Sequence, residues 1–266
     1  MKNYLIGFIG CGNMGGALVR AAAKSVDGDQ IAVCDYDEKK AQALAKECGA
    51  SALSANELAK NCRFIVLGVK PQNMHETIAG FASELKENES AVVITMAAGL
   101  SIAAIRSFIG ADLPVIRIMP NTPAQVGEGM ILYDTRGVSK TDEQAFLDCF
   151  AKAGVLDKIP EEKIDAASAL SGCGPAFVYA FAEALADGAV ECGVPRDKAA
   201  CYAAQTLLGA AKMLLTYGHP ADLKDAVCSP GGTTIAGVHA LEKAGFRNAA
   251  MDAVSAAYKR TLELKK

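Results

Sequence analysis

Three glycines near the N-terminus have the spacing of a nucleotide-binding turn. Gly10, Gly12 and Gly15 follow a short apolar run as G-x-G-x-x-G and open a helical pattern. The first glycine of such a turn allows the tight bend, the second lets the backbone approach a pyrophosphate, and the third lets the helix pack against the strand. Free N–H groups at the helix N-terminus then attract the phosphates. The alternative is an ordinary glycine-rich turn, which the surrounding strand and helix pattern disfavours.

An acidic residue, Asp35, closes the second predicted strand, where a carboxylate can accept hydrogen bonds from an adenosine ribose. A carboxylate there repels the 2′-phosphate of NADPH and so favours NADH, although Lys39 and Lys40 follow closely and soften the repulsion. On its own, Asp35 fits a second role almost as well, as the cap of the next helix. The sequence leaves both roles open.

Three later loops follow predicted strands, at the sheet edge where a fold of this kind holds the nicotinamide and the substrate. They are Gly68–Pro71 (GVKP), Met96–Gly99 (MAAG) and Met119–Pro123 (MPNTP). All three form turns and carry small or polar residues. Lys70 suits a solvated loop position as well as a binding role, and Asn121 suits a turn between two prolines.

A fourth loop lies near the C-terminus and joins two glycines to two hydroxyl side chains. Ser229 and Pro230 are followed by Gly231, Gly232, Thr233 and Thr234 at the start of a helical pattern. Bare backbone N–H groups and hydroxyls at a helix start suit a small carboxylate. The alternative is a capped turn between helices, but two consecutive glycines are more than a cap requires.

The glycine turn, Asp35 and the three later loops all lie in a region that alternates between β-rich runs and helical stretches as far as residue 160. This alternation predicts βαβ units and a parallel sheet, that is, a Rossmann-type dinucleotide-binding domain over residues 1–160. The helix candidate Asp37–Cys48 has its apolar residues on one face. The predicted strands are Tyr4–Ile9, Gln30–Asp35, Arg63–Val69, Ala91–Met96 and Pro114–Met119, with a weaker pair at Met130–Tyr133 and Val155–Lys158.

Strand signals stop after residue 160, and residues 161–266 predict an all-helical second domain. Its helix candidates are Ile164–Leu170, Pro175–Cys192, Arg196–Tyr217, a short turn near Leu223, Thr233–Lys243 and Phe246–Leu264. Within them, Ala203–Leu215 is apolar on nearly all sides, so it needs cover on more than one side. We expect a second subunit to supply part of that cover, which makes this domain a dimerisation domain as well.

Composition narrows the class of protein. The chain has 266 residues, 51% hydrophobic and 21% charged, with 27 basic and 30 acidic side chains and a net charge of −3, which predicts a globular protein and argues against a nucleic-acid partner. Charged residues such as Glu183 and Asp187 break the most apolar stretches, so no membrane span is expected. The nine cysteines form no CxxC pair, which favours a reduced cytoplasmic compartment, and three widely separated histidines argue against a metal site.

Several blocks of this sequence together resemble the pyrroline-5-carboxylate reductase family of proline biosynthesis. They are FIGCGNM at Phe8–Met14, VKP at Val69–Pro71, MPNTPA at Met119–Ala124, SGCGPAF at Ser171–Phe177, and SPGGTT at Ser229–Thr234 followed by LEKAGFR at Leu241–Arg247. The resemblance covers essentially the whole chain, and the last two blocks are its most specific part.

The resemblance implies an NAD(P)H-dependent reduction of the cyclic imine Δ1-pyrroline-5-carboxylate to L-proline, in a homodimer that can close into a ring of dimers. It implies a substrate site at Ser229, Gly231, Gly232, Thr233 and Thr234, with the Thr234 hydroxyl near the ring nitrogen as the catalytic contribution. It implies cofactor contacts at Gly10, Cys11, Gly12, Asn13, Met14, Gly15, Asn56, Gly68, Val69, Lys70, Pro71, Met96, Ala97 and Ala98. A cofactor contact at Asp35 is predicted from its place at the end of the second predicted strand and not from the resemblance.

The chain departs from the family pattern at two places. Cys173 stands where a second serine is common, which puts the role of that hydroxyl in doubt, and Asp35 with Tyr36 stands where many relatives carry residues suited to NADPH. Two other functions stay open. A 3-hydroxy acid dehydrogenase would want a lysine on the helix after Leu170, and residues 171–192 contain none. A nucleotide-sensing scaffold without catalysis would not need the hydroxyls at Thr233 and Thr234.

Overall fold

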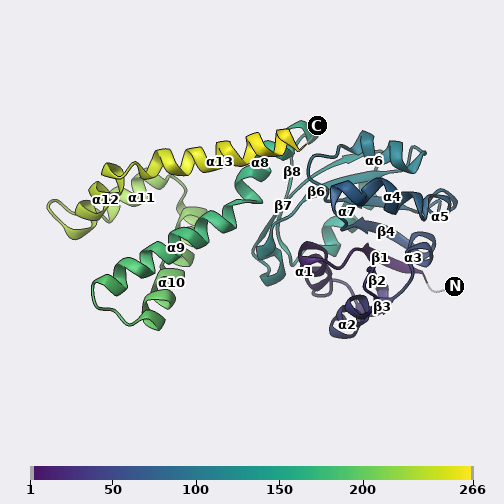
Figure 1. The fold of residues 1–266 in the computed structure, drawn as a ribbon, viewed down its shortest axis with the longest axis horizontal. Helices are drawn as coiled ribbons and strands as arrows, with labels where there is room; N and C mark the ends of the chain where they lie inside the picture. The colour runs from purple at the N-terminus through teal and green to yellow at the C-terminus, as the bar shows by residue number, and fades with distance from the viewer. Residues whose placement is uncertain (1–2, 265–266) are drawn as a thin grey trace. The chain divides into compact units, whose positions relative to one another are not determined.

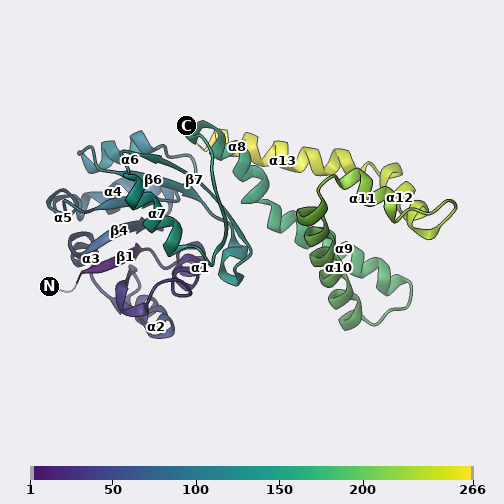
Figure 2. The same cartoon turned by 180° about the vertical axis from the view of Figure 1, so that it is seen from behind.

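The computed structural model describes residues 3–264 of the chain, and these residues separate into two compact units. The first, here called the sheet unit, comprises residues 3–173 together with 257–264. The second, here called the helical unit, comprises Gly174–Ala256. Figure 1 and Figure 2 show the elements of each unit from opposite sides.

The sheet unit contains an eight-stranded sheet with the order β3-β2-β1-β4-β5-β6-β7-β8. The strands from β1 to β6 pair in parallel, β7 is antiparallel to β6, and β8 is parallel to β7. The strands are β1 (Tyr4–Ile9), β2 (Ile31–Cys34), β3 (Ser51–Ala52), β4 (Cys62–Leu67), β5 (Val92–Thr95), β6 (Val115–Met119), β7 (Gly129–Arg136) and β8 (Gly154–Lys158).

Helices cover both faces of this sheet, as expected for a parallel sheet whose crossovers are helical. Apolar residues of α1, α2 and α7 form a core on one face, and those of α3, α4, α5 and α6 form a second core on the other. The helices are α1 (Asn13–Ala22), α2 (Glu38–Cys48), α3 (Ala55–Asn61), α4 (Met74–Ala79), α5 (Ala82–Glu87), α6 (Ile102–Ile109), α7 (Lys140–Cys149) and α8 (Glu161–Ser171), with short 3-10 turns η1 (Gly28–Gln30), η2 (Pro71–Asn73) and η3 (Thr122–Val126).

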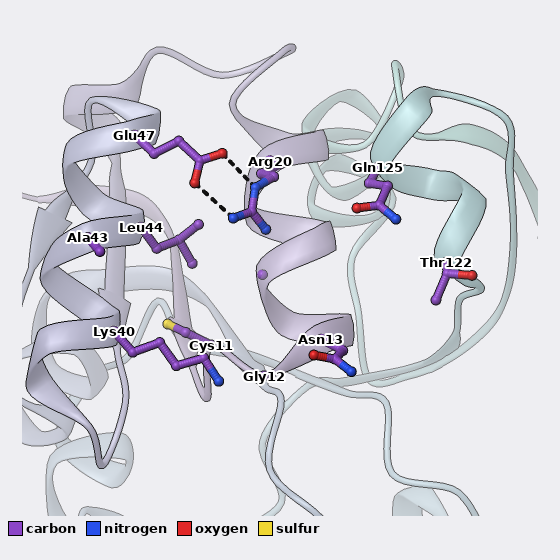
Figure 3. Close-up of a pocket in the computed structure, with 11 residues that line it drawn as sticks. Cys11, Gly12, Asn13, Arg20, Lys40, Ala43, Leu44, Glu47, Thr122 and Gln125 are labelled. Atoms are coloured by element: carbon purple, nitrogen blue, oxygen red, sulfur yellow. Dashed lines mark hydrogen bonds and ion pairs between the residues drawn. The ribbon is translucent and has the colours of Figure 1, made fainter.

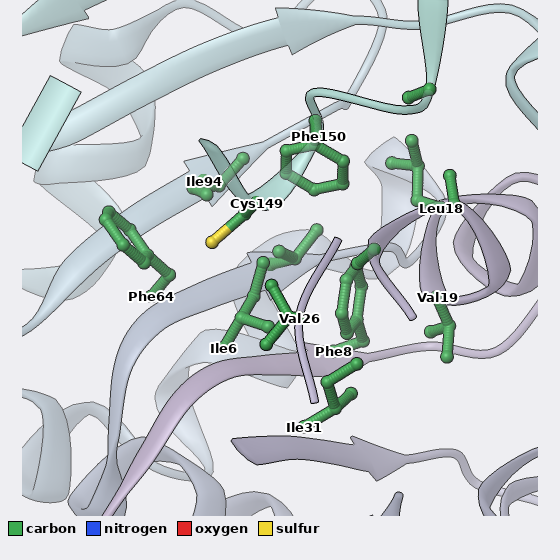
Figure 4. Packing of buried hydrophobic residues seen from close by; sticks show 14 of the residues in the cluster. Ile6, Phe8, Leu18, Val19, Val26, Ile31, Phe64, Ile94, Cys149 and Phe150 are labelled. Atoms are coloured by element: carbon green, nitrogen blue, oxygen red, sulfur yellow. The ribbon is translucent and has the colours of Figure 1, made fainter. Parts of the chain in front are cut away.

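The first of these cores is dense. Phe8 of β1, Phe64 of β4 and Phe150 after α7 are at most 1% exposed, and the Phe8 and Phe150 rings meet edge to face with centroids 6.5 Å apart (Figure 4). Burial of each aromatic side chain of this size stabilises the folded unit by about 2–3 kcal/mol. The position of the strand ends, and therefore of the loops that follow them, is fixed by this packing.

The sheet reverses its strand order between β1 and β4. From β1 the chain goes through α1 to β2 on one side, whereas β4 pairs with β1 on its other side. The carboxyl ends of the two strands stay joined, because the Gly68 N–H donates to the Ile9 carbonyl at 2.7 Å. Open sheets bind ligands in the crevice outside the carboxyl ends of the strands at such a reversal, so a ligand is expected at this edge of the sheet.

Caps explain several of the helix boundaries. The Asp37 carboxylate accepts the N–H groups of Lys39 and Lys40 at the start of α2, which ends at Gly49 with a φ of +67°. Ser54 and Glu57 form a reciprocal capping box at the start of α3. Each cap satisfies N–H or C=O groups that the helix itself leaves without a partner.

The helical unit contains α9 (Gly174–Glu191), α10 (Arg196–Tyr217), α11 (Pro220–Ala226), α12 (Thr233–Lys243) and the first part of α13 (Phe246–Glu263). Its buried cluster consists of only three small residues, Ala186, Ala199 and Ala203. The rings of Phe181 and Phe246 pack with centroids 5.3 Å apart. Many large apolar side chains of this unit remain exposed in the single chain.

The structure confirms the fold class and the predicted strands and helices, whose boundaries differ from the predicted ones by at most three residues. The strand β3 was not predicted, because Ser51–Ala52 is too short to have a period. The expected boundary between residues 160 and 161 stays a prediction: the sheet unit extends through α8 to Cys173 and also includes the end of α13.

One helical stretch, Glu161–Glu191, is long and apolar enough to cross a membrane by length and composition, with a mean hydropathy of 1.3. Core helices of proteins in solution meet the same criterion, so this finding carries little weight. The absence of a membrane span therefore also stays a prediction.

Candidate active site

The three glycines of the first turn have the separate roles that their spacing predicts. Gly10 has a φ of +103°, and a Cβ there would lie 2.7 Å from the backbone of Gly68. A Cβ at Gly15 would lie 2.0 Å from the Gly10 carbonyl oxygen, so only glycine lets α1 pack this closely on the turn. A Cβ at Gly12 would meet nothing within 4 Å. The turn is therefore closed on its protein side and open on its outer side.

The N-terminus of α1 is available for an anion. Gly12 is the N-cap residue, and no side chain caps the first turn, which begins with Asn13 and Met14. Uncapped N–H groups and the helix dipole together favour a phosphate at this position. This open face at Gly12 fits the pyrophosphate of a dinucleotide.

Asp35 lies directly against the glycine turn. Its Oδ2 accepts a hydrogen bond from the Cys11 N–H at 2.6 Å, and its Oδ1 accepts one from the Asp37 N–H at 3.0 Å. The helix that follows is capped by Asp37 and not by Asp35. The capping alternative for Asp35 is therefore wrong, and its carboxylate is fixed beside the turn.

Two cavities flank this carboxylate. A cavity of about 510 Å³ lies between α1, α2 and η3. Figure 3 shows Arg20 of α1 bonded directly to Glu47 of α2 in its lining, with 2.6 Å from Nε to Oε1 and 2.8 Å from Nη2 to Oε2. Lys40, Cys11 and Asn13 also line it. A second cavity of about 340 Å³ lies at the ends of β2 and β3. Its lining includes Asp35, Tyr36, Leu53, Ser54 and Glu57.

The loops after β4 and β5 reach the same edge of the sheet as the glycine turn. A Cβ at Gly68 would lie 2.7 Å from the Gly10 carbonyl oxygen, so the two turns touch through their backbones. Val69 is half-buried, while Lys70 is exposed and precedes η2, which Pro71 opens. After β5, Met96 is half-buried, Ala97 is buried and Ala98 is exposed. The structure therefore gathers these predicted residues around one sheet edge.

Asn56 is the predicted cofactor residue that the structure does not bring to the glycine turn. Its amide donates to the Gly80 carbonyl at 3.3 Å and to Glu84 at 2.6 Å, and it lines a different cavity with Lys60 and Ser83. These bonds tie α3 to α5. A contact of Asn56 with the cofactor stays a prediction, and a structural role explains its position without one.

The loop predicted to bind a carboxylate belongs to the helical unit and opens α12. Gly231 has a φ of +69°, which favours glycine, and a Cβ at Gly232 would lie 2.3 Å from the Ser229 hydroxyl oxygen, so a side chain at Gly232 would displace that hydroxyl. Gly232 caps α12 without any side-chain hydrogen bond. Thr233 and Thr234 are exposed in the first turn. The loop thus presents free N–H groups and two hydroxyls, as a carboxylate site requires.

Asn121, predicted to lie either at the substrate edge or in a simple turn, and Arg117, for which no role was predicted, both hold the end of the sheet in place. The Asn121 amide donates to the Ser171 carbonyl at 2.9 Å, and its oxygen accepts from the Met130 N–H at 2.9 Å. Arg117, 2% exposed on β6, bonds Asp165 of α8 at 2.6 Å. In the sequence, the signal that could have indicated this ion pair is an arginine within an apolar strand, because a buried charge needs a partner of opposite charge.

Three buried cysteines of the sheet unit carry no sign of catalytic use. Burial, with smaller contributions from Asp35 and Cys34, raises the pKa of the Cys11 thiol to about 12, and burial raises those of Cys62 and Cys149 to about 12. These thiols stay protonated near neutral pH and are poor nucleophiles. Among residues 3–264 the structure also contains no cluster of histidine, cysteine and carboxylate side chains that could hold a metal ion.

Comparison with known proteins identifies the family. Residues 161–264 match the family described as pyrroline-5-carboxylate reductase dimerisation, and residues 5–99 match that described as NADP oxidoreductase, coenzyme F420-dependent. The pyrroline-5-carboxylate reductase of Escherichia coli is 40% identical over 266 residues, covering 98% of each chain. That of Methanosarcina acetivorans is 39% identical and covers 100% of both chains. The chain belongs to the pyrroline-5-carboxylate reductase family.

Solved structures of the family agree with this fold over the whole chain. The Plasmodium falciparum pyrroline carboxylate reductase crystallised with NADP bound has a TM-score of 0.89 at 33% identity, covering 100% of both chains. The Coxiella burnetii pyrroline-5-carboxylate reductase has a TM-score of 0.88 at 31% identity, also over 100% of both. The fold predicted from the sequence, a Rossmann-type domain followed by a helical dimerisation domain, is confirmed, and the alternative of a 3-hydroxy acid dehydrogenase gains no support.

Proposed function

We propose that this protein reduces Δ1-pyrroline-5-carboxylate to L-proline with NADH or NADPH as the hydride donor. The observation that carries the proposal is that one chain of this family holds both an open glycine turn at α1 and an uncapped hydroxyl-bearing helix start at α12. The first suits a dinucleotide and the second suits the carboxylate of a small amino-acid precursor.

On the cofactor side, the backbone from Gly10 to Gly15 would hold the pyrophosphate, and Asp35 would accept hydrogen bonds from the adenosine ribose. The loops Gly68–Pro71 and Met96–Ala98 would border the nicotinamide end. The open space at Gly12 supports this assignment, because any side chain at that position would occupy the path of the phosphates. When bound, the reduced nicotinamide ring supplies the hydride.

On the substrate side, Ser229 and the backbone of Gly231, Gly232, Thr233 and Thr234 would surround the carboxylate. The N–H groups of Thr233 and Thr234 would donate to it, whereas the Gly232 N–H already donates to the Ser229 carbonyl at 3.0 Å. The positive end of the α12 dipole favours that negative charge. The Thr234 hydroxyl is the proposed catalytic group, placed to hydrogen-bond the ring nitrogen, which stays protonated as the imine carbon accepts the hydride.

The reaction needs little else from the protein. A protonated imine is already electrophilic at C5, so placing the two reactants against each other supplies most of the rate enhancement. Such a reaction needs no thiolate nucleophile, which agrees with the protonated state of the buried thiols of Cys11, Cys62 and Cys149. It also agrees with the lack of lysine in residues 171–192.

The proposal includes a homodimer formed through the helical unit, and further association of dimers into a ring. The exposed apolar side chains of α10, among them Leu208 at 45% and Leu215 at 86%, support the dimer. A cytoplasmic location is also part of the proposal, supported by nine cysteines that are all unpaired.

Steady-state kinetics test the proposed reaction directly. The purified protein is mixed with NADH or NADPH and either pyrroline-5-carboxylate or a panel of 3-hydroxy acids with the oxidised cofactors, and absorbance at the nicotinamide band is followed. We expect turnover with the imine alone and formation of L-proline. Turnover only with 3-hydroxy acids would refute the proposal.

Calorimetry separates an enzyme from a nucleotide-sensing scaffold. Titration of L-proline into protein saturated with oxidised cofactor is expected to release or absorb heat, because the carboxylate site at α12 would be filled. Cofactor binding with no second heat would instead favour the scaffold.

A further inference from the structure

We infer that Asp35 makes NADH the preferred cofactor of this protein over NADPH. The inference rests on the proposed function, since it concerns the dinucleotide that the glycine turn would hold. It differs from what is known of the Plasmodium falciparum relative, whose structure contains NADP.

The first argument is the position of the carboxylate. Asp35 follows β2 at the carboxyl edge of the sheet and is bonded to the turn itself through the Cys11 N–H at 2.6 Å. The bond from the Asp37 N–H at 3.0 Å holds the other oxygen. Because both oxygens are fixed, the carboxylate cannot swing away from a ligand on the turn without losing both bonds.

The second argument is the hydrogen-bonding capacity that remains. A carboxylate has about four acceptor positions, and two backbone N–H groups use two of them. The other two can accept the 2′- and 3′-hydroxyls of an adenosine ribose. A 2′-phosphate offers no such donors near neutral pH and brings a charge of about −2 instead.

The third argument is the charge of the cavity at the ends of β2 and β3. Three carboxylates, Asp35, Glu38 and Glu57, line it, and no lysine, arginine or histidine among the described residues does. A phosphate entering there would meet like charges on several sides.

The basic side chains that line the larger cavity, Arg20 and Lys40, offer a 2′-phosphate limited compensation for this repulsion. The Arg20 guanidinium donates through Nε and Nη2 to the two carboxylate oxygens of Glu47, so its charge is already paired. Lys40 is the remaining basic side chain that lines the larger cavity, on an exposed position of α2. One exposed lysine is screened by solvent and salt, whereas the Asp35 carboxylate is fixed at the turn.

The experiment measures dissociation constants of NADH and NADPH by the fluorescence of the reduced nicotinamide, in the absence of any imine. For the unaltered protein we expect NADH to bind at least roughly tenfold more tightly than NADPH, the size of one close charge repulsion near a surface. Equal binding, or tighter binding of NADPH, would overturn the inference.

Variants at two neighbouring carboxylates locate the effect. Asp35→Asn and Asp35→Ser are expected to reduce the NADH preference by about tenfold, because each removes the fixed charge. Asp37→Asn removes an equal charge two positions away, where the side chain caps α2, and should leave the preference almost unchanged. An equal shift in Asp37→Asn and Asp35→Asn would contradict the role of Asp35.

A measurement on the unaltered protein avoids any dependence on folding of the variants. Raising the salt concentration screens charge interactions. If repulsion by Asp35 dominates, the dissociation constants of NADH and NADPH should therefore become more similar at high salt. A preference that widens with salt would mean that attraction by Lys40 dominates, and the inference would be wrong. The imine assay is scored separately: a protein that prefers NADH in binding but reduces no imine refutes the proposed function and not this inference.

Discussion

The sheet unit and the helical unit bury their apolar residues to very different extents. The largest side chains of the sheet unit, such as Phe64 and Phe146, are fully buried. In the helical unit Leu215 is 86% exposed, Met251 is 70% exposed, and the buried cluster contains only alanines. The sheet unit therefore has the core of an independent domain, whereas the helical unit lacks one.

The difference comes from the elements themselves. A sheet presents two broad apolar faces, and each helix of the sheet unit needs only one apolar stripe to cover a part of them. The helical unit has no sheet, and α10 is apolar around most of its circumference. A few helices of this length cannot surround one another completely, so their remaining apolar surface is available to a second copy.

The largest expected effect follows from placing a charge on this exposed surface. Leu215→Glu puts a carboxylate on each side of a two-fold interface, and burying such charges costs several kcal/mol. We expect dissociation of the dimer and a loss of imine reduction of at least roughly a thousandfold. Sedimentation velocity and the kinetic assay measure the two effects.

Two controls sharpen that comparison. Gln205→Glu adds a charge at an exposed polar position of the same helix and should change neither mass nor activity. Binding of NADH to Leu215→Glu should be retained, because the sheet unit has its own core. A stable, fully active monomer of 27.6 kDa would show that this surface is not an interface.

A pair of glycine variants tests the sheet unit. In Gly15→Ala the new Cβ lies 2.0 Å from the Gly10 carbonyl oxygen, so α1 must move, and we expect a loss of stability of about 1–3 kcal/mol as well as of cofactor binding. In Gly12→Ala the Cβ meets nothing within 4 Å, so stability should be unchanged. The methyl group should still weaken cofactor binding by roughly thirtyfold, since it occupies the path of the pyrophosphate.

Thermal unfolding and fluorescence titration measure these two effects independently. Equal losses of stability in the two variants would contradict the assignment of Gly15 to helix packing and of Gly12 to the ligand.

The buried thiols of the sheet unit predict loss of stability in alkali. The pKa values of Cys11, Cys62 and Cys149 are raised from 9.0 to about 12 in the folded chain, chiefly by burial. A group whose folded pKa is raised stabilises the protein below its unfolded pKa, and that stability is lost as pH rises from 9 toward 12. At pH 10 the loss is about 1 kcal/mol per thiol.

Urea unfolding under reducing conditions at a series of pH values measures this loss. Cys62→Ala should make the dependence of stability on pH shallower, because one of the thiols whose pKa is raised by burial is removed. A slope that does not change in Cys62→Ala would contradict the assignment.

The smallest effect is expected at the substrate loop. Thr234→Ala removes one neutral hydrogen bond, worth about 0.5–1.5 kcal/mol, so kcat/KM should fall roughly twofold to tenfold. Cofactor affinity should not change, because the hydroxyl is on the substrate side. Thr234→Ser keeps the hydroxyl and serves as the control; an unchanged kcat/KM in Thr234→Ala would remove the proposed role.

Much of the fold was accessible from local patterns. The strands β1 and β6, with the helices α10 and α12, follow from runs of β-branched residues, helical periodicity and the glycines and prolines between them. The roles of Gly10 and Gly15 also followed from their spacing, since the bend and the close packing are set within a few residues.

Other features depend on residues that are distant in the sequence. Nothing in the chain near Asp35 indicates that its carboxylate accepts the Cys11 N–H, and nothing near Asn56 indicates that its amide is bonded to Glu84. The pairing of Arg117 with Asp165 joins a strand to a helix far along the chain. Side-chain partners of this kind arise only when the folded elements meet.

The sequence by itself determined the class of fold, the family, and the two loops that can do chemistry, because these depend on residue type and on spacing within single elements. The tertiary structure alone decided that Asp35 is held against the glycine turn, that Asp37 and not Asp35 caps α2, and that the helical unit is left with exposed apolar surface. The physical reason is that hydrogen-bond partners and burial are properties of packed elements, and packing brings together residues that no local pattern relates.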